Sequence, residues 1–234
     1  MKIAVLVPFY NEEENLKFFV KEWNDYLNLY NLKNVSFFFI DDGSTDESVK
    51  SLEKSLFKSK LIFKIIKKKN SGHGSTCQYG YKFIIKLNFD YLLQIDSDNQ
   101  CDPKYFMTFY DMINDNNSSF IFGYRKSRGD GKYRILISKI MSSIFFLKKG
   151  IYIKDLNTPY RMMNIQKLKN ILIGIDKKEK NRDIDLYNCM LSYEIAKEQK
   201  INWIDIHFRE RFYGFTKFSM SKMLKLFINF IVKI

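Results

Sequence analysis

Short apolar runs alternate with longer amphipathic stretches through the first half of the chain. Runs rich in β-branched and aromatic residues are typical of buried strands, and apolar residues three or four positions apart are typical of helices. The pattern predicts strands at Ile3–Phe9, Val35–Asp41, Leu61–Lys67, Asp90–Asp96 and Phe120–Tyr124. Helices are predicted near Glu13–Leu29, Thr45–Phe57, Gly74–Leu87 and Pro103–Ile113. This alternation indicates an α/β fold, a mostly parallel sheet with helices on both faces.

Polar and acidic residues follow four of the predicted strands. The segments are PFYNEEEN from Pro8, DDGS from Asp41, NSGHG from Asn70 and DSDNQ from Asp96. Ligands of parallel α/β sheets bind at the carboxyl ends of the strands, which meet at one edge of the sheet. We therefore expect an active site at this edge. Neither a GxGxxG motif after the first strand nor a Walker A motif occurs, which disfavours dinucleotide binding.

Asp96, Asp98 and Gln100 occupy alternate positions after the fourth predicted strand. In an extended segment, alternate side chains point to the same side. Two carboxylates and an amide oxygen suit a hard divalent cation, Mg²⁺ or Mn²⁺, that keeps open positions for substrate phosphates. A solvated turn is the alternative, but the position after an apolar strand favours a metal site.

The other two clusters have both structural and functional interpretations. Asp41 and Asp42 suit a capping turn before the next helix, while one carboxylate could accept hydrogen bonds from a base or ribose. The Asn70–Gly74 segment would let the backbone approach an anion at a helix N-terminus, or it is an ordinary tight loop.

As a set, the motifs resemble the inverting glycosyltransferases of family 2, which have the Rossmann-like GT-A fold. Within that family, the chain is most similar to the dolichol-phosphate mannose synthase and polyprenyl-phosphate glycosyltransferase branch. The motifs are VPFYNEEENL (7–16), DDGSTD (41–46), NSGHG (70–74), QIDSDNQCDP (94–103), GYRKSRG (123–129), DLNTPYRMM (155–163) and RFYGFTK (211–217). The sequence departs from the family pattern at Thr158-Pro159-Tyr160 and Thr216, which leaves the sugar open.

The resemblance implies a set of site residues. Base, ribose and sugar contacts are implied for Pro8, Tyr10, Glu12, Asp41 and Asp42. Metal and diphosphate contacts are implied for Asp96, Ser97, Asp98 and Gln100. Contacts to the diphosphate or to an acceptor phosphate are implied for Arg125, Arg211 and Lys217, with Arg134 and Arg161 assisting. Asp98, Arg211 and Lys217 are the expected catalytic residues, and Asp185 is the candidate general base, with helix capping as its alternative.

The chain of 234 residues carries a net charge of +13 that is concentrated in its second half. Residues 1–117 have a net charge of −1 and residues 118–234 one of +14, and all seven Arg lie at or beyond position 125. A basic half indicates an anionic partner, although base composition of the genome also raises the Lys content. Three scattered Cys, with no CxxC pair, predict an intracellular protein.

The last 17 residues, Phe218–Ile234, are apolar except for a narrow polar stripe. The stripe, at Lys222, Lys225, Asn229 and Lys233, has helical spacing. Both this segment and Arg134–Lys149 are too short and too interrupted by Lys to span a bilayer. We expect a GT-A domain at 1–217 and an amphipathic helix at 218–234 that lies on an anionic membrane surface. A core helix or an oligomer contact is the alternative.

These observations predict an inverting transfer of a hexose from a GDP- or UDP-sugar to a polyprenyl phosphate. The protein would be cytoplasmic and peripheral on the inner face of the membrane, with no nucleic-acid partner. One alternative is a family 2 transferase that acts on a sugar hydroxyl. The other is a non-catalytic basic module that binds membranes or nucleic acid, which would not explain acids at successive strand ends.

Overall fold

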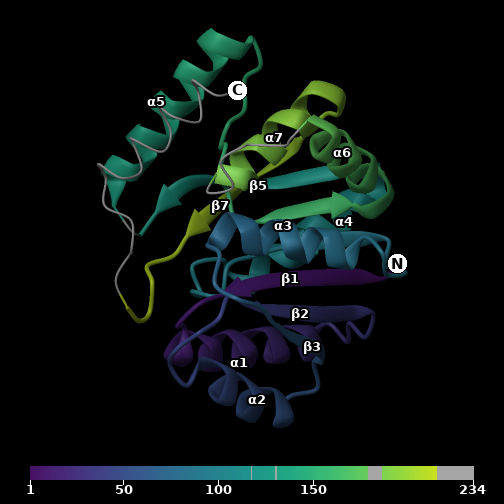
Figure 1. Ribbon diagram of the computed structural model, residues 1–234, viewed down its shortest axis with the longest axis vertical. Coiled ribbons are helices and arrows are strands. Elements are labelled where there is room, and N and C mark those ends of the chain that lie inside the picture. The colour runs from purple at the N-terminus through teal and green to yellow at the C-terminus, as the bar shows by residue number, and fades with distance from the viewer. Residues whose placement is uncertain (117, 130, 179–185, 215–234) are drawn as a thin grey trace.

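The computed structural model describes residues 1–116, 118–129, 131–178 and 186–214 (Figure 1). The strands are β1 (Ile3–Phe9), β2 (Val35–Asp41), β3 (Ile62–Lys67), β4 (Tyr91–Gln94), β5 (Phe120–Arg128), β6 (Arg161–Asn164) and β7 (Asn202–Phe208). The helices are α1 (Glu13–Leu29), α2 (Ser48–Phe57), α3 (His73–Ile84), α4 (Phe106–Asn116), α5 (Lys132–Lys149), α6 (Ile165–Lys178) and α7 (Tyr187–Glu198). A short 3₁₀ turn at Pro103–Tyr105 leads into α4.

Within the described residues, the strands form one seven-stranded sheet in the order β3-β2-β1-β4-β6-β5-β7. β3, β2, β1 and β4 are parallel neighbours, and β6 runs antiparallel between β4 and β5. The predicted α/β class with a mostly parallel sheet is confirmed. Because β6 is reversed, its first residues, rather than its last, lie at the edge where β1, β2 and β4 end.

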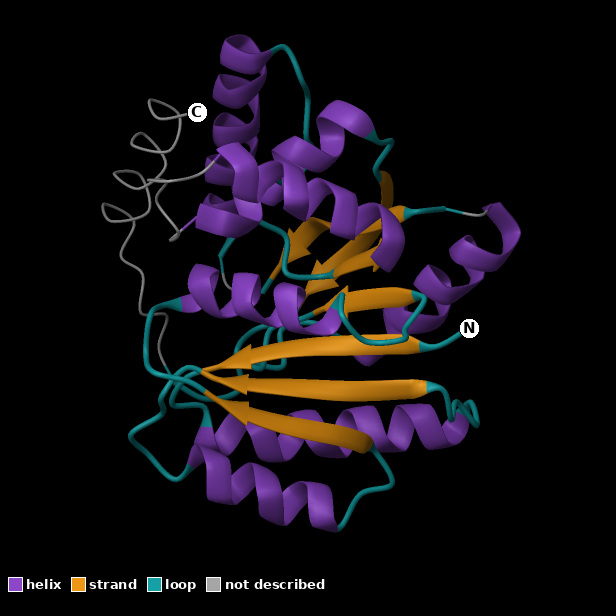
Figure 2. Cartoon of the chain, turned by 45° about the vertical axis from the view of Figure 1, so that its right-hand side comes forward, coloured by secondary structure: helices purple, strands orange, loops and turns teal. Residues whose placement is uncertain are grey.

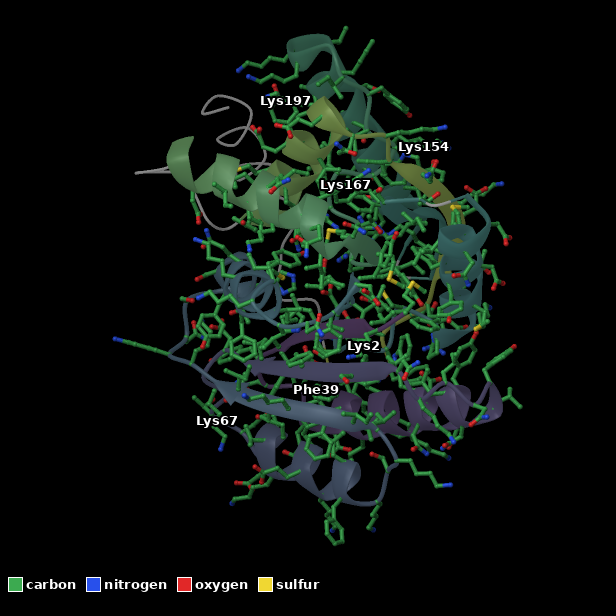
Figure 3. All side chains as sticks on the ribbon, turned by 90° about the vertical axis from the view of Figure 1, so that its right-hand side faces the viewer. Lys2, Phe39, Lys67, Lys154, Lys167 and Lys197 are labelled. Atoms are coloured by element: carbon green, nitrogen blue, oxygen red, sulfur yellow. The ribbon has the colours of Figure 1, made fainter. Side chains whose placement is uncertain are left out.

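Helices cover both faces of the sheet (Figures 1 and 2). Alternate residues of β1 point to opposite faces, so Val5 packs in one core with α1, α2 and α4, while Leu6 packs in the other with α3, α6 and α7. On the first face, the Phe39 ring on β2 (Figure 3) lies 5.9 Å from the Phe19 ring of α1. Burial of strands on both faces explains why they read as continuous apolar runs.

α3 packs closely on β1, because a Cβ on Gly80 would clash with the Leu6 side chain. α3 follows the end of β3, so its first residues lie at the carboxyl edge of the sheet. Within the described residues, no helix has both the length and the apolarity that crossing a membrane requires.

Several predicted boundaries were wrong. β4 ends at Gln94 rather than Asp96, and α2 begins at Ser48 rather than Thr45. Asp46 accepts a hydrogen bond from the Ser48 N–H at 3.0 Å, so the preceding residues form a turn instead of a first helical turn. Further along, Asn99 has a φ of +61° and turns the chain before Gln100.

Candidate active site

The predicted clusters do meet at the carboxyl ends of β1, β2 and β4. Asp41 closes a turn by accepting a hydrogen bond from the Ser44 N–H at 2.9 Å. Ser44 in turn accepts one from the Asn11 N–H at 3.0 Å, and the Asn11 side chain accepts one from the Thr45 N–H at 2.8 Å. These bonds join the ends of β1 and β2, and the Asp42 N–H donates to the Phe9 carbonyl at 2.9 Å, so the backbone is held on both sides of Tyr10.

Asp42 holds the loop that precedes α3. Its carboxylate is 3% exposed and accepts hydrogen bonds from the Lys68 ammonium at 2.5 Å and from the N–H groups of Ser71 and Gly72, both at 2.9 Å. Burial raises the pKa of Asp42, but the hydrogen bonds from Lys68 and Ser71 outweigh it and hold the pKa below its ordinary value. These contacts give Asp42 a structural role in holding the loop, and its expected contact with the ribose stays a prediction.

Asp96 and Asp98 form an acidic pair beyond the end of β4. Burial, together with the neighbouring carboxylates of Asp96 and Glu12, raises the pKa of Asp98 to about 7, although the Arg211 guanidinium and the hydrogen bond from the Gln100 N–H act to lower it. Asp96 accepts a hydrogen bond from the Gln94 amide at 3.1 Å. The site therefore holds closely spaced carboxylates that repel one another.

Gln100 does not join the two carboxylates in the way the alternation predicted. The segment is not extended, and the Gln100 amide donates to the main-chain oxygen of Arg209 at 2.9 Å. The Gln100 N–H donates to Asp98 Oδ1 at 3.2 Å. Gln100 thus joins the loop to the segment after β7 through its side-chain nitrogen, and its role as a metal ligand stays a prediction.

Arg211 lies beside the acidic pair and forms an ion pair with Glu12 at the start of α1. Its Nε is buried and has no hydrogen-bond partner within the described residues. The segment around it is anchored by Arg209, which pairs with Glu22 through two hydrogen bonds of 2.7 and 2.9 Å. Asn15 adds a bond to the Tyr213 N–H at 3.2 Å. The residues after β7 therefore close over the first turn of α1.

The other predicted arginines are not at this cluster. Arg161 is fully buried and donates to the main-chain oxygens of Thr158, Asn188 and Leu156 at 2.6, 2.8 and 3.2 Å. This packing gives Arg161 a structural role, and its expected contact with the nucleotide sugar stays a prediction.

Arg125 and Arg134 make their hydrogen bonds with residues outside the acidic pair. Arg125 makes two hydrogen bonds of 2.7 and 2.8 Å to the buried Asp155 and so holds the segment that enters β6. Arg134 lies in the first turn of α5, where it donates to the Tyr133 hydroxyl at 3.4 Å.

Pro8 and Ser97 lie within this edge but are buried, Pro8 in β1 opposite Ile40 of β2 and Ser97 at 4% exposure between the two aspartates. Lys217, Asp185 and the predicted helix at 218–234 lie outside the described residues.

Two residues of the cluster were missed as site residues. His73, the first residue of α3, has its Nε2 3.6 Å from Asp96 Oδ1, with 46% of the side chain exposed. Lys68 neutralises Asp42 from the end of β3. The NSGHG motif gave a signal for His73, whereas one lysine of the run Lys67-Lys68-Lys69 could not be singled out without the sheet register.

A divalent cation fits the acidic pair. No group of three or more His, Cys, Asp or Glu side chains converges on one point within the described residues. Mg²⁺ and Mn²⁺ sites that act on phosphates, however, use one or two carboxylates and complete their coordination with water and substrate oxygens. Asp96 and Asp98 supply two carboxylates whose mutual repulsion a cation would relieve.

The fold and this site together are those of an α/β protein that has its ligand site at the carboxyl ends of its parallel strands. Residues 4–182 match the family model for glycosyl transferase family 2, and the chain belongs to that family. An uncharacterized protein of Methanocaldococcus jannaschii is 28% identical over 180 residues, which cover 74% of this chain and 76% of that protein.

Solved structures with low sequence identity share the fold. TarS 1–349 of S. aureus in complex with UDP-GlcNAc is 19% identical with a TM-score of 0.63, over 100% of this chain and 66% of that one. Glucosyl-3-phosphoglycerate synthase from Mycobacterium tuberculosis, in complex with Mn²⁺, UDP-glucose and phosphoglyceric acid, is 14% identical with a TM-score of 0.61. That alignment covers 99% of this chain and 77% of the synthase.

Proposed function

We propose that the protein transfers a hexosyl group from a nucleoside diphosphate sugar, GDP- or UDP-linked, to the phosphate of a polyprenyl phosphate, with inversion at the anomeric carbon. The observation that carries the proposal is the acidic pair Asp96 and Asp98 beside the Glu12–Arg211 ion pair. It lies at the strand edge where α/β folds bind their ligands.

The nucleotide would bind along the ends of β1 and β2. Tyr10, Glu12 and Asp41 line this stretch and are the proposed contacts for base and ribose. The hydrogen bonds that join Asn11, Ser44 and Thr45 keep these residues in place before the ligand arrives. Preorganisation of this kind lowers the entropy cost of binding.

In the proposed reaction, a phosphate oxygen of the acceptor forms a bond to the anomeric carbon. The bond from that carbon to the donor diphosphate breaks, and its electron pair leaves with the nucleoside diphosphate. Asp96 and Asp98 would hold Mg²⁺ or Mn²⁺, which would offset charge developing on the leaving group. The buried Arg211 Nε is a second donor available to that charge.

A phosphate acceptor suits a site in which a bound metal ion and Arg211 would supply the positive charge. The second pKa of a phosphate monoester is near 6, so at pH 7 the nucleophile is already mostly a dianion and needs no general base. The synthase of the same fold was crystallised with UDP-glucose and with phosphoglyceric acid, a phosphate ester, so the fold can hold a ligand that carries a phosphate together with a sugar nucleotide. The lipid chain of the acceptor follows from the resemblance and from the proposed interfacial helix at 218–234, which would hold the protein on the inner face of the membrane.

A transfer panel tests the proposal. The purified protein is incubated with UDP- and GDP-hexoses, with Mg²⁺ or Mn²⁺, and with either a polyprenyl phosphate or an acceptor sugar that has free hydroxyl groups. We expect a metal-dependent product only with the phosphate, and its loss in Asp98→Asn. Transfer to the sugar hydroxyl alone would overturn the phosphate acceptor and identify a hydroxyl acceptor. Salt-sensitive binding to vesicles or nucleic acid, without transfer or nucleotide binding, would instead support a non-catalytic module.

A further inference from the structure

The last residue of β4, Gln94, is a fully buried polar side chain in a core that is otherwise largely apolar. It is 0% exposed, and the other three residues of the strand are buried as well. Because alternate residues of a strand share a face, Gln94 lies with Leu92 on the side of the sheet that α3, α6 and α7 cover. A buried carboxamide is unfavourable unless its polar atoms have partners, whereas leucine would fill this position without that requirement. The amide therefore indicates a role beyond packing.

The partners of Gln94 connect two helices to the acidic pair. Its side-chain nitrogen donates to Asp96 Oδ1 at 3.1 Å, and its side-chain oxygen lies 3.3 Å from the Tyr81 hydroxyl of α3. The same hydroxyl lies 3.0 Å from the side-chain oxygen of Asn188 on α7. We refer to Gln94, Tyr81 and Asn188, all at most 4% exposed, as the buried triplet. The triplet is a continuous set of polar contacts that ends at the carboxylate of Asp96.

The far end of the buried triplet is fixed by the surrounding core. The main-chain oxygen of Asn188 accepts hydrogen bonds from the Arg161 guanidinium at 2.8 Å and from the Ser192 hydroxyl at 2.9 Å. Burial raises the pKa of Tyr81 well above its ordinary value, so its hydroxyl stays protonated and remains a donor. The orientation of the Gln94 amide is therefore set by groups on α3 and α7, and not by the loop that carries the acidic pair.

The two carboxylate oxygens of Asp96 have different surroundings. Oδ1 accepts the hydrogen bond from Gln94, and His73 Nε2 lies 3.6 Å from the same oxygen. Within the described residues, neither a hydrogen bond nor an ion pair engages Oδ2. The side chain of Asp96 is 26% exposed, so a ligand can reach it. One oxygen thus faces protein groups, and the other is left for a ligand.

From these contacts we propose that Gln94, held by Tyr81 and Asn188, is a positioning residue that directs Oδ2 of Asp96 toward the divalent cation. The inference rests on the proposed function, in which Asp96 and Asp98 hold Mg²⁺ or Mn²⁺, and it adds the groups that orient one of these ligands. Hydrogen-bond partners of a metal ligand fix its orientation, and their loss typically lowers metal affinity by about 10- to 100-fold. Without the Gln94 amide, the Asp96 carboxylate would be free to rotate away from the neighbouring carboxylate of Asp98.

Mn²⁺ titration of the full chain, followed by electron paramagnetic resonance, tests the proposal without a sugar nucleotide or an acceptor. The test variants are Gln94→Met, which keeps the side-chain length but has no amide, and Tyr81→Phe. The matched control is Tyr91→Phe, which removes another buried hydroxyl, 3.0 Å from the main-chain oxygen of Ser118, at the opposite end of β4. We expect Mn²⁺ affinity to fall about tenfold in Gln94→Met, to fall by a smaller factor in Tyr81→Phe, and to stay unchanged in Tyr91→Phe.

Urea unfolding separates this role from a purely structural one, and affinities are compared where all variants are folded. Lower stability with wild-type Mn²⁺ affinity in both test variants would overturn the proposal. Equal losses of affinity in Tyr81→Phe and Tyr91→Phe would also overturn it. If Gln94→Met does not fold, the comparison of the two Tyr→Phe variants decides.

The same titration distinguishes this inference from the proposed function. Wild-type protein that binds Mn²⁺ and loses it in the test variants, yet transfers no hexose, would contradict the proposed function and support the role of Gln94. Wild-type protein that transfers hexose, with Mn²⁺ affinity unaffected by either test variant, would contradict the role of Gln94 alone. Wild-type protein that binds no Mn²⁺ would overturn the metal role of the acidic pair and this inference with it.

Discussion

The guanidinium of Arg211 pairs with the carboxylate of Glu12, which lies 199 positions earlier in the chain. This contact links the segment after β7 to the start of α1 and brings a cation beside Asp98. The acidic pair therefore receives its partial charge compensation from a part of the chain that is remote in sequence.

Replacement of this guanidinium tests its role in the reaction. In Arg211→Ala, we expect kcat/KM to fall by about 10²-fold or more, because removal of one donor to a developing negative charge has an effect of that size. Steady-state transfer kinetics measure the change. Lys126→Ala, which removes a cation paired with Asp205 at the surface, is the control with the same charge change. Equal activities of the two variants would remove Arg211 from the catalytic residues.

Metal affinity should depend on pH through Asp98. Its pKa of about 7 means that a proton competes with the cation, so Mn²⁺ affinity should fall by about tenfold from pH 8 to pH 6. Mn²⁺ titration followed by electron paramagnetic resonance measures it on the protein alone. Asp98→Asn should bind weakly at both pH values, while Asp205→Asn should behave as wild type. A pH-independent affinity in wild type would contradict the assignment.

Asp42→Asn should destabilise the protein by about 2 kcal/mol at pH 7, since it weakens a charge-assisted contact with Lys68. Because the folded pKa of Asp42 is below its ordinary value, this stabilisation is present above the unfolded pKa of about 4 and is lost as the pH falls through the folded pKa. Urea unfolding at pH 7 and at low pH gives the two differences. The exposed Asp111→Asn is the control, and a difference that persists in acid would contradict the linkage.

Arg161→Met should act on stability rather than on nucleotide binding. The change leaves three buried carbonyl groups short of a donor, and we expect a loss of about 3 kcal/mol in the free energy of unfolding. Urea unfolding measures this, and nucleotide affinity is compared at a temperature where both proteins are folded. Arg134→Met is the control. Unchanged stability together with lost nucleotide affinity would restore Arg161 as a ligand contact.

Asp185 and Lys217 separate the two acceptor classes. For a phosphate acceptor, we expect Asp185→Asn to lower turnover by less than about tenfold, whereas Lys217→Ala should have a far larger effect. Removal of a general base lowers turnover by about 10²–10⁴-fold. A loss of that size in Asp185→Asn, with nucleotide affinity preserved, would indicate a hydroxyl acceptor.

The first half of the fold was predictable because its strands are buried on both faces and read as apolar runs between helical patterns. The reversal of β6 was not, because its four residues, Arg161 to Asn164, are too short for a periodic signal. The burial of Arg161 was not predictable for the same reason. A buried arginine and a ligand-binding arginine cannot be told apart in a sequence until the strand that carries the arginine is placed in the sheet.

At the site, composition after each strand was enough to predict that the acidic groups converge. The detail depended on backbone conformation and on distant partners. The alternation argument for Gln100 assumed an extended chain, but Asn99 adopts a left-handed conformation. The contacts of Asp42 with Lys68 and Ser71 could not be predicted, because these partners are 26 and 29 positions away in the sequence.

The position of Asp42 also determines where phosphate charge can be met. The first N–H groups of a helix and the residues before it normally attract external anions, yet here the Ser71 and Gly72 N–H groups already donate to a carboxylate of the same chain. The Asp42 carboxylate therefore partly neutralises the positive end of α3 and leaves less positive charge there for a diphosphate. Neutralisation of the diphosphate charge would then depend on a divalent ion and on Arg211. Chelation of the metal should therefore weaken binding of the diphosphate far more than binding of the nucleoside.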